Sequence, residues 1–475
     1  MRRKAVWSGI ILALALAGIF SACGEARQSE RVQVVFWHSM GGPLGDALNQ
    51  LIDEFNQAHP DIHILGVAMG NYTALQTKLM ASIQADKQPD IAQAFESWIA
   101  NFIEANKLAS MDQFIAADPE FRATMDDIYP VFLRSNTFRD TLWAFPFNKS
   151  VRVLYYNKDL FFNNGLRVGD RPADPPATWE EFREYCRILT RRNDKGVAEV
   201  YGTTYPVSAW QFENLLLQAG GEIMAEDNRT PLFNSEYGVE ALDFLAGLLN
   251  ADSTAYLSVG YEGQNDFLAG KVAMVEGSSV SVAYMRRTGI DFLLGIGAIP
   301  THRTKRNIIS GTNVIIFRKG NPRVEQAAWE FVKWFTAPAQ TARWSEMTYY
   351  MPVRRSAFAE PALVQRLNEY PEMRAVYEQL EHATYEPPIP QWLDARKHLE
   401  EQVIEKVLRG QVAPAAALDA AAAQIEQDLQ GTRGEGTRQQ EGERSYLMEL
   451  MVLLAGLILV IALVMVFLRL RSWKR

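Results

Sequence analysis

Short apolar runs alternate with amphipathic stretches at the start of the chain. Apolar side chains dominate 32–37, 62–67 and 91–95, as expected for strands buried in a sheet. Between these runs, apolar residues recur at helical spacing over 44–55 and 75–83. Strands that alternate with helices in this way predict an α/β domain with a mostly parallel sheet.

A different pattern follows near residue 150. Two extended apolar segments, 143–147 and 151–156, are separated only by Asn148, Lys149 and Ser150. No helix fits between them, so we expect the chain to cross there from one lobe into another.

The alternation of predicted strands and helices then repeats. Thr178 and Glu181 have the spacing of a capping box, which predicts the start of a helix. Apolar periodicity predicts further helices over 210–219, 237–249, 280–286, 324–335, 392–409 and 414–429, and strands over 272–275 and 313–317.

The N-terminus has the pattern of a targeting signal. Basic residues at 2–4 precede an apolar run over 10–20 and two small residues before Cys23, which is the order of regions in a secretory signal peptide. We expect 1–22 to be removed and Cys23 to be lipidated, as in a bacterial lipoprotein.

The C-terminus predicts a membrane anchor. Residues 450–468 are uninterruptedly apolar and would form a helix of about 28 Å, close to the thickness of a bilayer core. Basic residues follow at once, which favours a cytoplasmic C-terminus. We therefore expect a transmembrane helix over 446–470, a flexible linker over 431–445, and a body at the periplasmic face of the bacterial inner membrane.

Composition narrows the possible partners. The whole chain has a net charge of −8, which becomes −11 when the three basic residues of the signal are removed. This acidity argues against nucleic acid as a partner. Of the two cysteines, Cys186 lies in a helical pattern, and we expect it to be an inert core thiol with no disulfide.

Motifs for catalysis are missing from the sequence. No HExxH, GxGxxG after a strand, GxxxxGK[ST] or GxSxG is present, and the six histidines have no ligand spacing. Motifs alone leave open a glycosidase-like acid pair. Most carboxylates, such as Glu400, Glu401 and Glu405, lie in helical charge patterns typical of a solvated face. We therefore expect binding rather than catalysis, with neither cofactor nor metal.

Four sequence blocks together resemble one family. Phe-Trp-His-Ser-Met at 36–40, Gly-Asn-Tyr at 70–72, Pro-Phe-Asn at 146–148 and Leu-Tyr-Tyr-Asn-Lys-Asp at 154–159 resemble the family 1 extracellular solute-binding proteins of ABC importers, in particular members that bind sn-glycerol 3-phosphate. The resemblance covers about 32–430.

That resemblance implies a two-lobed periplasmic-binding-protein fold of type II, the Venus flytrap, which closes over a small-molecule ligand and docks on an ABC permease. We expect a monomer. We place the first lobe at 32–147 and 310–345, and the second at 148–309 and 346–430.

The resemblance also implies the ligand contacts. Tyr72 and Glu96 would hold glycerol hydroxyls, and Arg396 would hold the phosphate, since a guanidinium donates two parallel hydrogen bonds. Gly311 would let the backbone approach the ligand. The remaining contacts would be Ser150, Ser278, Trp210 and Tyr350.

The match departs from the family pattern in the second lobe. The glycerol phosphate-binding members have two tryptophans three positions apart, and here Val207 takes the place of the first while Trp210 keeps the second. Lys149 and Arg152 add positive charge beside Ser150 that could compensate for this loss, but we expect them to be surface charges. A neutral sugar or oligosaccharide stacked on Trp98, Trp210 and Tyr350 is the first alternative, a membrane-anchored sensor is the second, and an enzyme comes last.

Overall fold

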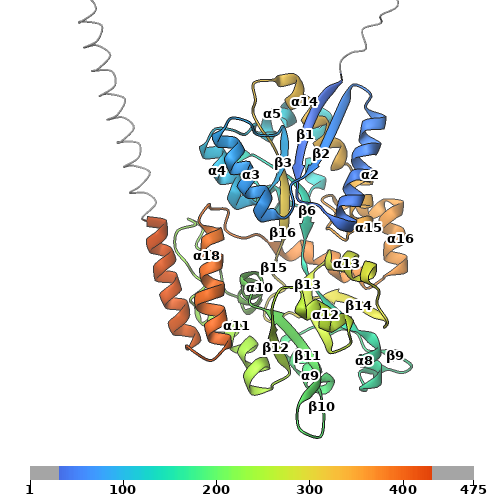
Figure 1. Cartoon of the computed structure of the whole chain (residues 1–475), viewed down its shortest axis with the longest axis vertical. Helices are drawn as coiled ribbons and strands as arrows, with labels where there is room; N and C mark the ends of the chain where they lie inside the picture. Colours follow the sequence, from blue (N-terminus) through green and yellow to red (C-terminus); the bar gives the residue numbers. More distant parts are fainter. Residues whose placement is uncertain (1–30, 431–475) are drawn as a thin grey trace, which may run out of the picture.

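A computed structural model describes residues 31–430, which form two lobes, each built around one β-sheet (Figure 1). The upper sheet in Figure 1 has the order β2-β1-β3-β16-β6. Its strands are β1 (Val32–His38), β2 (Ile62–Ala68), β3 (Ile91–Ala94), β6 (Phe145–Ser150) and β16 (Ser310–Ile316). β1 is parallel to β2 and β3, whereas β16 is antiparallel to its neighbours β3 and β6. The mostly parallel sheet predicted for this lobe is present.

Helices of the first lobe bury one apolar face each. α2 (Gly42–Ala58) buries Leu44, Leu48, Leu51 and Phe55, whose i, i+4, i+7 spacing places them on one side. The ring of Phe55 meets that of Phe331 edge to face, 5.1 Å away. The other helices of this region are α3 (Tyr72–Gln84), α4 (Glu96–Glu104), α5 (Met111–Ala117), α6 (Pro119–Arg122), α7 (Pro130–Arg134), α14 (Pro322–Phe335) and α15 (Pro338–Thr348).

The second sheet is mixed and has the order β10-β11-β13-β7-β14, with β12 paired to β11. β11 is parallel to β12 and β13, while β7 lies antiparallel between β13 and β14. The strands are β7 (Arg152–Asn157), β10 (Arg191–Arg192), β11 (Ala198–Pro206), β12 (Ala255–Ser258), β13 (Val272–Ser278) and β14 (Leu294–Ala298). Short two-stranded sheets are formed by β4 (Thr137–Phe138) with β5 (Thr141–Leu142) and by β8 (Arg167–Val168) with β9 (Arg171–Pro172).

The predicted capping box opens α9 (Trp179–Leu189). The hydroxyl of Thr178 accepts a hydrogen bond from the Glu181 amide at 3.1 Å, and the Glu181 carboxylate accepts one from the Ala177 amide at 2.7 Å. This helix buries Cys186 completely, and burial raises the pKa of its thiol well above the usual value. The core position predicted for Cys186 is confirmed.

The remaining helices complete the second lobe and the region between the lobes. The predicted helix over 392–409 is α18 (Trp392–His398) and α19 (Glu405–Leu408), joined by a π-helical stretch at Leu399–Ile404. A final helix covers 414–430. The others are α8 (Lys158–Asn163), α10 (Ala209–Ala219), α11 (Glu236–Ala246), α12 (Glu262–Leu268), α13 (Ser281–Thr288), α16 (Pro361–Glu369) and α17 (Met373–Glu378).

The chain passes between the lobes three times. β6 ends at Ser150 and β7 begins at Arg152, so the first passage is at Val151, three residues later than the predicted boundary, because β6 stays paired with β16 as far as Ser150. The second joins β15 (Asn307–Ile308) to β16. The third follows α15, which still packs against α2 beyond the predicted boundary at 345, and reaches β17 (Ala383–Thr384), the partner of β15.

Several predictions fall outside the described residues: the signal at 1–22, the lipidated Cys23, the linker over 431–445 and the transmembrane helix over 446–470. Between residues 31 and 430, every helix is too short or too polar to cross a membrane.

The structure gives a reason for a glycine at position 311 that the sequence did not reveal. Its φ is +102°, and a Cβ at this position would lie 1.9 Å from the carbonyl oxygen of Asn148 on β6. The register of β6 and β16 shifts directly afterwards, between Thr312 and Asn313. The close approach of the neighbouring strand therefore requires a glycine here whether or not a ligand also contacts this backbone.

Gly311→Ala should destabilise the protein by at least about 2 kcal/mol, since it adds both a clash and an unfavourable φ. The measurement is the midpoint of thermal unfolding. Gly410→Ala is the matched control, because Gly410 has a φ of +70° with open space around its Cβ position. Equal midpoints for the two variants would contradict this explanation.

Candidate ligand-binding site

Polar side chains gather at the first passage between the lobes, in residues 148–152, which we call the crossover segment. Asn148 and Lys149 are fully buried, and Ser150 and Arg152 are each 4% exposed. Buried polar groups need hydrogen-bond or ionic partners, because water no longer serves them. The predicted ligand-contacting residues supply several of these partners.

Asn148 joins two tyrosines that are far apart in the sequence. Its side-chain amide donates to the hydroxyls of Tyr72 and Tyr350, both at 3.0 Å. Its carbonyl oxygen accepts from Gln93 at 3.2 Å and from Thr312. Burial raises the pKa of both tyrosines, so both hydroxyls stay neutral. No role for Asn148 was predicted from the sequence, although its position in the Pro-Phe-Asn block beside the crossover was a signal.

Lys149 and Glu96 form a buried ion pair. The lysine ammonium lies 2.6 Å from a Glu96 oxygen, and Glu96 is at the first position of α4 with a side chain only 17% exposed. Burial lowers the pKa of Lys149, while the charges of Glu96 and Glu386 act in the opposite direction. The expected surface location of Lys149 is therefore wrong: the strand that carries it is covered on both faces. Glu96 is its counterion as well as a candidate acceptor for ligand hydroxyls.

Arg152 is also buried, which corrects the second predicted surface charge. Its guanidinium contacts Glu276 through two nitrogens, each 3.2 Å from the same carboxylate oxygen. The guanidinium also lies over the ring of Trp210, 5.2 Å from its centroid, in a cation–π arrangement. Ser278 is the residue paired with Arg152 in the β7–β13 ladder. Trp210 and Ser278 thus lie on the second-lobe side of the crossover segment.

Ser150 and Gly311 complete the strand pairing at this point. Ser150 is paired with Ser310, and Gly311 with Lys149, in the β6–β16 ladder. Both predicted residues therefore lie beside the buried ion pair of Lys149 and Glu96.

Arg396 approaches from the C-terminal helices. It lies on α18, is half-buried, and places one guanidinium nitrogen 3.0 Å from a Glu386 oxygen. The charge of Glu386 raises the pKa of Lys149, and the charge of Glu96 raises that of Glu386. The Arg396–Glu386 pair is thus within electrostatic reach of the Lys149–Glu96 pair, but Arg396 already has a carboxylate on its guanidinium. Glu386 was not found from the sequence, where no motif marks it.

Two of the proposed sugar-stacking aromatics are covered. Trp98 and Tyr350 are each 4% exposed. Trp98 packs on the edge of Phe95, and Tyr350 stacks on Trp344. Trp210 is half-buried and keeps one face on Arg152. The aromatic platform for a sugar is therefore reduced to Trp210.

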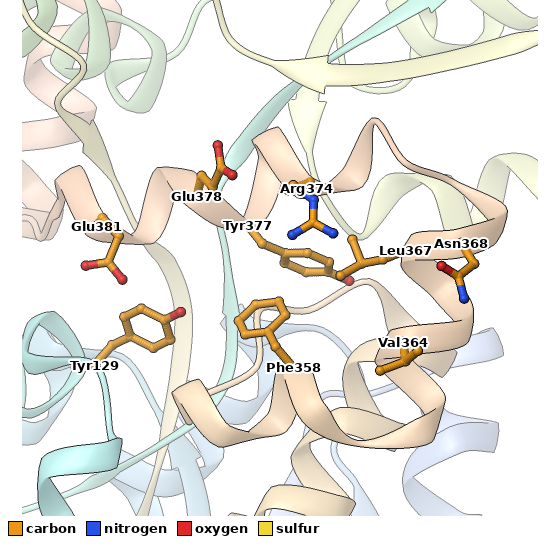
Figure 2. Close-up of a pocket in the computed structure, with 9 residues that line it drawn as sticks. All are labelled: Tyr129, Phe358, Val364, Leu367, Asn368, Arg374, Tyr377, Glu378 and Glu381. Carbon is orange, nitrogen blue, oxygen red and sulfur yellow. The ribbon is translucent and has the colours of Figure 1, made fainter.

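A surface cavity of about 320 Å³ lies elsewhere, beside α16 and α17 (Figure 2). Figure 2 shows the rings of Phe358 and Tyr377 beside one another, with Tyr129 and Glu381 at one end. The cavity shares no residue with the crossover segment or with the predicted contacts. This cavity is therefore separate from the candidate ligand site at the crossover segment.

The lobes also touch at their outer edge. The Tyr284 hydroxyl on α13 donates to the Gly41 carbonyl oxygen at 3.2 Å, and Arg287 lies 3.6 Å from Asp46 on α2. Contact between the lobes therefore occurs both at the crossover segment and at this edge.

Comparison with known sequences gives consistent matches. A family model described as bacterial extracellular solute-binding protein matches residues 50–375. The sn-glycerol-3-phosphate-binding periplasmic protein of Yersinia pseudotuberculosis is 26% identical over 440 residues, which cover 86% of this chain and 94% of that protein. Its counterpart in Pectobacterium atrosepticum is 27% identical over 431 residues, or 86% and 93% of the two chains.

Solved structures share the fold. A Mycobacterium tuberculosis protein crystallised with glycerophosphocholine superposes with a TM-score of 0.73 at 21% identity, covering 84% of this chain and 99% of that one. The cyclic α-maltosyl-1,6-maltose binding protein of Arthrobacter globiformis gives 0.72 at 24% identity, covering 84% and 100%. The two-lobed fold and the resemblance of the sequence blocks are confirmed. The chain belongs to the bacterial extracellular solute-binding proteins, the substrate-binding components of ABC importers.

Proposed function

We propose that this protein captures a glycerol phosphate compound, either sn-glycerol 3-phosphate or a glycerophosphodiester, and delivers it to an ABC permease. The observation that carries the proposal is the gathering of the Tyr72 and Tyr350 hydroxyls on Asn148 and of Glu96 on Lys149. The Arg396–Glu386 ion pair lies near enough for the charge of Glu386 to act on Lys149. Side chains that accept hydrogen bonds from hydroxyls suit the glycerol end of such a ligand, and a guanidinium suits its phosphate. The names of the relatives from Yersinia and Pectobacterium support the same ligand class.

The charges of the site favour a diester over a monoester. Lys149 is paired with Glu96, Arg152 with Glu276, and Arg396 with Glu386. These pairs leave little surplus positive charge for a phosphate dianion, whose burial needs compensating charge. A phosphodiester carries one negative charge and requires less compensation.

A neutral sugar is the second candidate. The balanced charges of the site would accept it, and the Arthrobacter protein with the same fold is named for a sugar ligand. The burial of Trp98 and Tyr350 counts against it, because these aromatics cannot stack on a sugar ring without rearrangement. For either ligand we propose no chemical step, only closure of the lobes and docking on the permease.

The body would be held at the periplasmic face of the inner membrane by the C-terminal apolar segment and by a lipid on Cys23. The support is the uninterrupted apolar run over 450–468 with its basic flank, and the small residues before Cys23. A tethered monomer would stay close to its permease.

Removal of the Arg396 guanidinium should separate phosphate from sugar ligands. Arg396→Ala should weaken binding of glycerophosphocholine by at least about 2 kcal/mol, roughly thirtyfold, because a charge-assisted contact is lost. Binding of maltose, if any, should change much less. Arg396→Lys should restore only part of the affinity, since an ammonium lacks the two-pronged geometry. Isothermal titration calorimetry of the wild type and both variants with each ligand, on the full-length protein in detergent, measures these affinities.

Arg409→Ala is the matched control, since Arg409 forms an exposed ion pair with Glu405 on the neighbouring α19. If the wild type binds maltose and not glycerophosphocholine or sn-glycerol 3-phosphate, the phosphate assignment is wrong.

The anchoring proposal has its own test. A reporter enzyme that works only in the cytoplasm should be active when fused after Arg475, and a periplasm-dependent reporter should be silent there. Cys23→Ser should abolish lipid labelling but leave the protein in the membrane fraction, because the C-terminal span remains. Activity of the periplasm-dependent reporter would refute the orientation.

A further inference from the structure

Arg396 and Glu386 form an ion pair in the structure. The pair is half-buried, with the Arg396 and Glu386 side chains 27% and 23% exposed, and the nitrogen–oxygen distance is 3.0 Å. A ligand phosphate that binds this guanidinium would have to share it with Glu386 or replace it. Glu386 therefore already holds the position on Arg396 that a ligand phosphate would take.

A second carboxyl lies behind this pair. Glu213 on α10 is fully buried, and neither of its oxygens has a hydrogen-bond donor among the described residues. The charges of Glu386, Arg396 and Glu400 all act on it, and its carboxyl lies within hydrogen-bonding reach of that of Glu386. A buried carboxyl without a donor is costly in its ionised form, and two carboxyls in contact are stabilised when they share one proton.

Burial, together with the charge of Glu386, raises the pKa of Glu213 well above its usual value, and burial also raises the pKa of Glu386, which Arg396 counteracts. With one proton on the pair, the single remaining negative charge is balanced by Arg396.

We propose that Glu386 and Glu213 form a proton-linked gate on Arg396, in which an anionic ligand replaces Glu386 and the displaced carboxylate takes up one proton. This inference rests on the proposed function, because it requires a ligand with a phosphate group. The proton comes from solvent and forms an O–H bond on one carboxyl of the pair, while Arg396 keeps its charge and binds the phosphate. A neutral ligand would leave the pair as it is.

The other charged groups around the pair are already engaged. Glu400 accepts a hydrogen bond from the Ala209 amide at 2.9 Å, at the start of α10. Lys149 is held by Glu96 at 2.6 Å. Lys149 is therefore not free to replace Arg396 as the counter-cation of a displaced Glu386, and Glu400, itself a carboxyl, cannot serve as one. The displaced Glu386 carboxylate would then lose its counter-cation beside Glu213, and the proton affinity of the pair would rise.

The sign of the pH dependence follows. Because the pair binds more protons in the liganded state than in the free state, affinity for an anionic ligand should rise as pH falls. Uptake of one proton corresponds to about a tenfold increase in affinity for each unit of pH, over the range where the free pair carries one proton.

The experiment is calorimetric titration of the full-length protein with glycerophosphocholine in buffers of different ionisation enthalpy at one pH, repeated at several pH values. We expect the wild type to take up about one proton for each ligand bound, whereas binding of maltose should exchange none. The double variant Glu213→Gln/Glu386→Gln should take up none. It should also bind glycerophosphocholine several-fold more tightly at neutral pH, because Arg396 is no longer occupied by a carboxylate.

Glu405→Gln, on the exposed ion pair with Arg409, is the control and should behave as the wild type. Binding of glycerophosphocholine by the wild type without proton uptake would overturn the gate and leave the proposed function standing; this result needs no variant to fold. Unchanged uptake in a folded double variant would also overturn it. A wild type that binds maltose alone would overturn the proposed function, and the gate with it.

Discussion

Burial of the polar crossover segment is the constraint on which the rest of the structure depends. A lysine and an arginine with almost no exposure lie within a few residues of each other, at the point where the chain leaves one sheet for the other. Each must keep a carboxylate partner, since an unpaired buried charge is strongly destabilising. Glu96, on the first lobe, is the partner of the lysine, and Glu276, on the second lobe, is the partner of the arginine.

The same constraint shapes the site chemically. Because its cations are already paired, the site does not attract a ligand by surplus charge, and the acidic protein as a whole would not draw an anion towards it. Selection of a ligand then depends on which existing partners it can replace. Of the three carboxylate partners, Glu386 is the most exposed, at 23% against 17% for Glu96 and 11% for Glu276, and under the proposed function it is the one that an anionic ligand would displace.

The crossover segment also links binding to the relative position of the lobes. Asn148 joins Tyr72, on α3, to Tyr350, two residues after the end of α15, on the first-lobe side. Arg152 joins Glu276 and Trp210 on the second-lobe side. The contact of Tyr284 with Gly41 at the outer edge gives the two lobes a second point at which to meet.

The sequence by itself determined the alternation of strands and helices, the capping box of α9, the buried position of Cys186, the crossing near residue 150 and the family. These are local properties, written in the spacing of apolar residues and in short blocks. Only the tertiary structure decided that Lys149 and Arg152 are buried and that Asn148 connects Tyr72 with Tyr350. It also decided that Gly311 makes room for a neighbouring strand and that Glu386 forms an ion pair with Arg396. Each of these depends on residues distant in sequence that meet only after the sheets have assembled, and apolar periodicity carries no information about which distant polar groups will become partners.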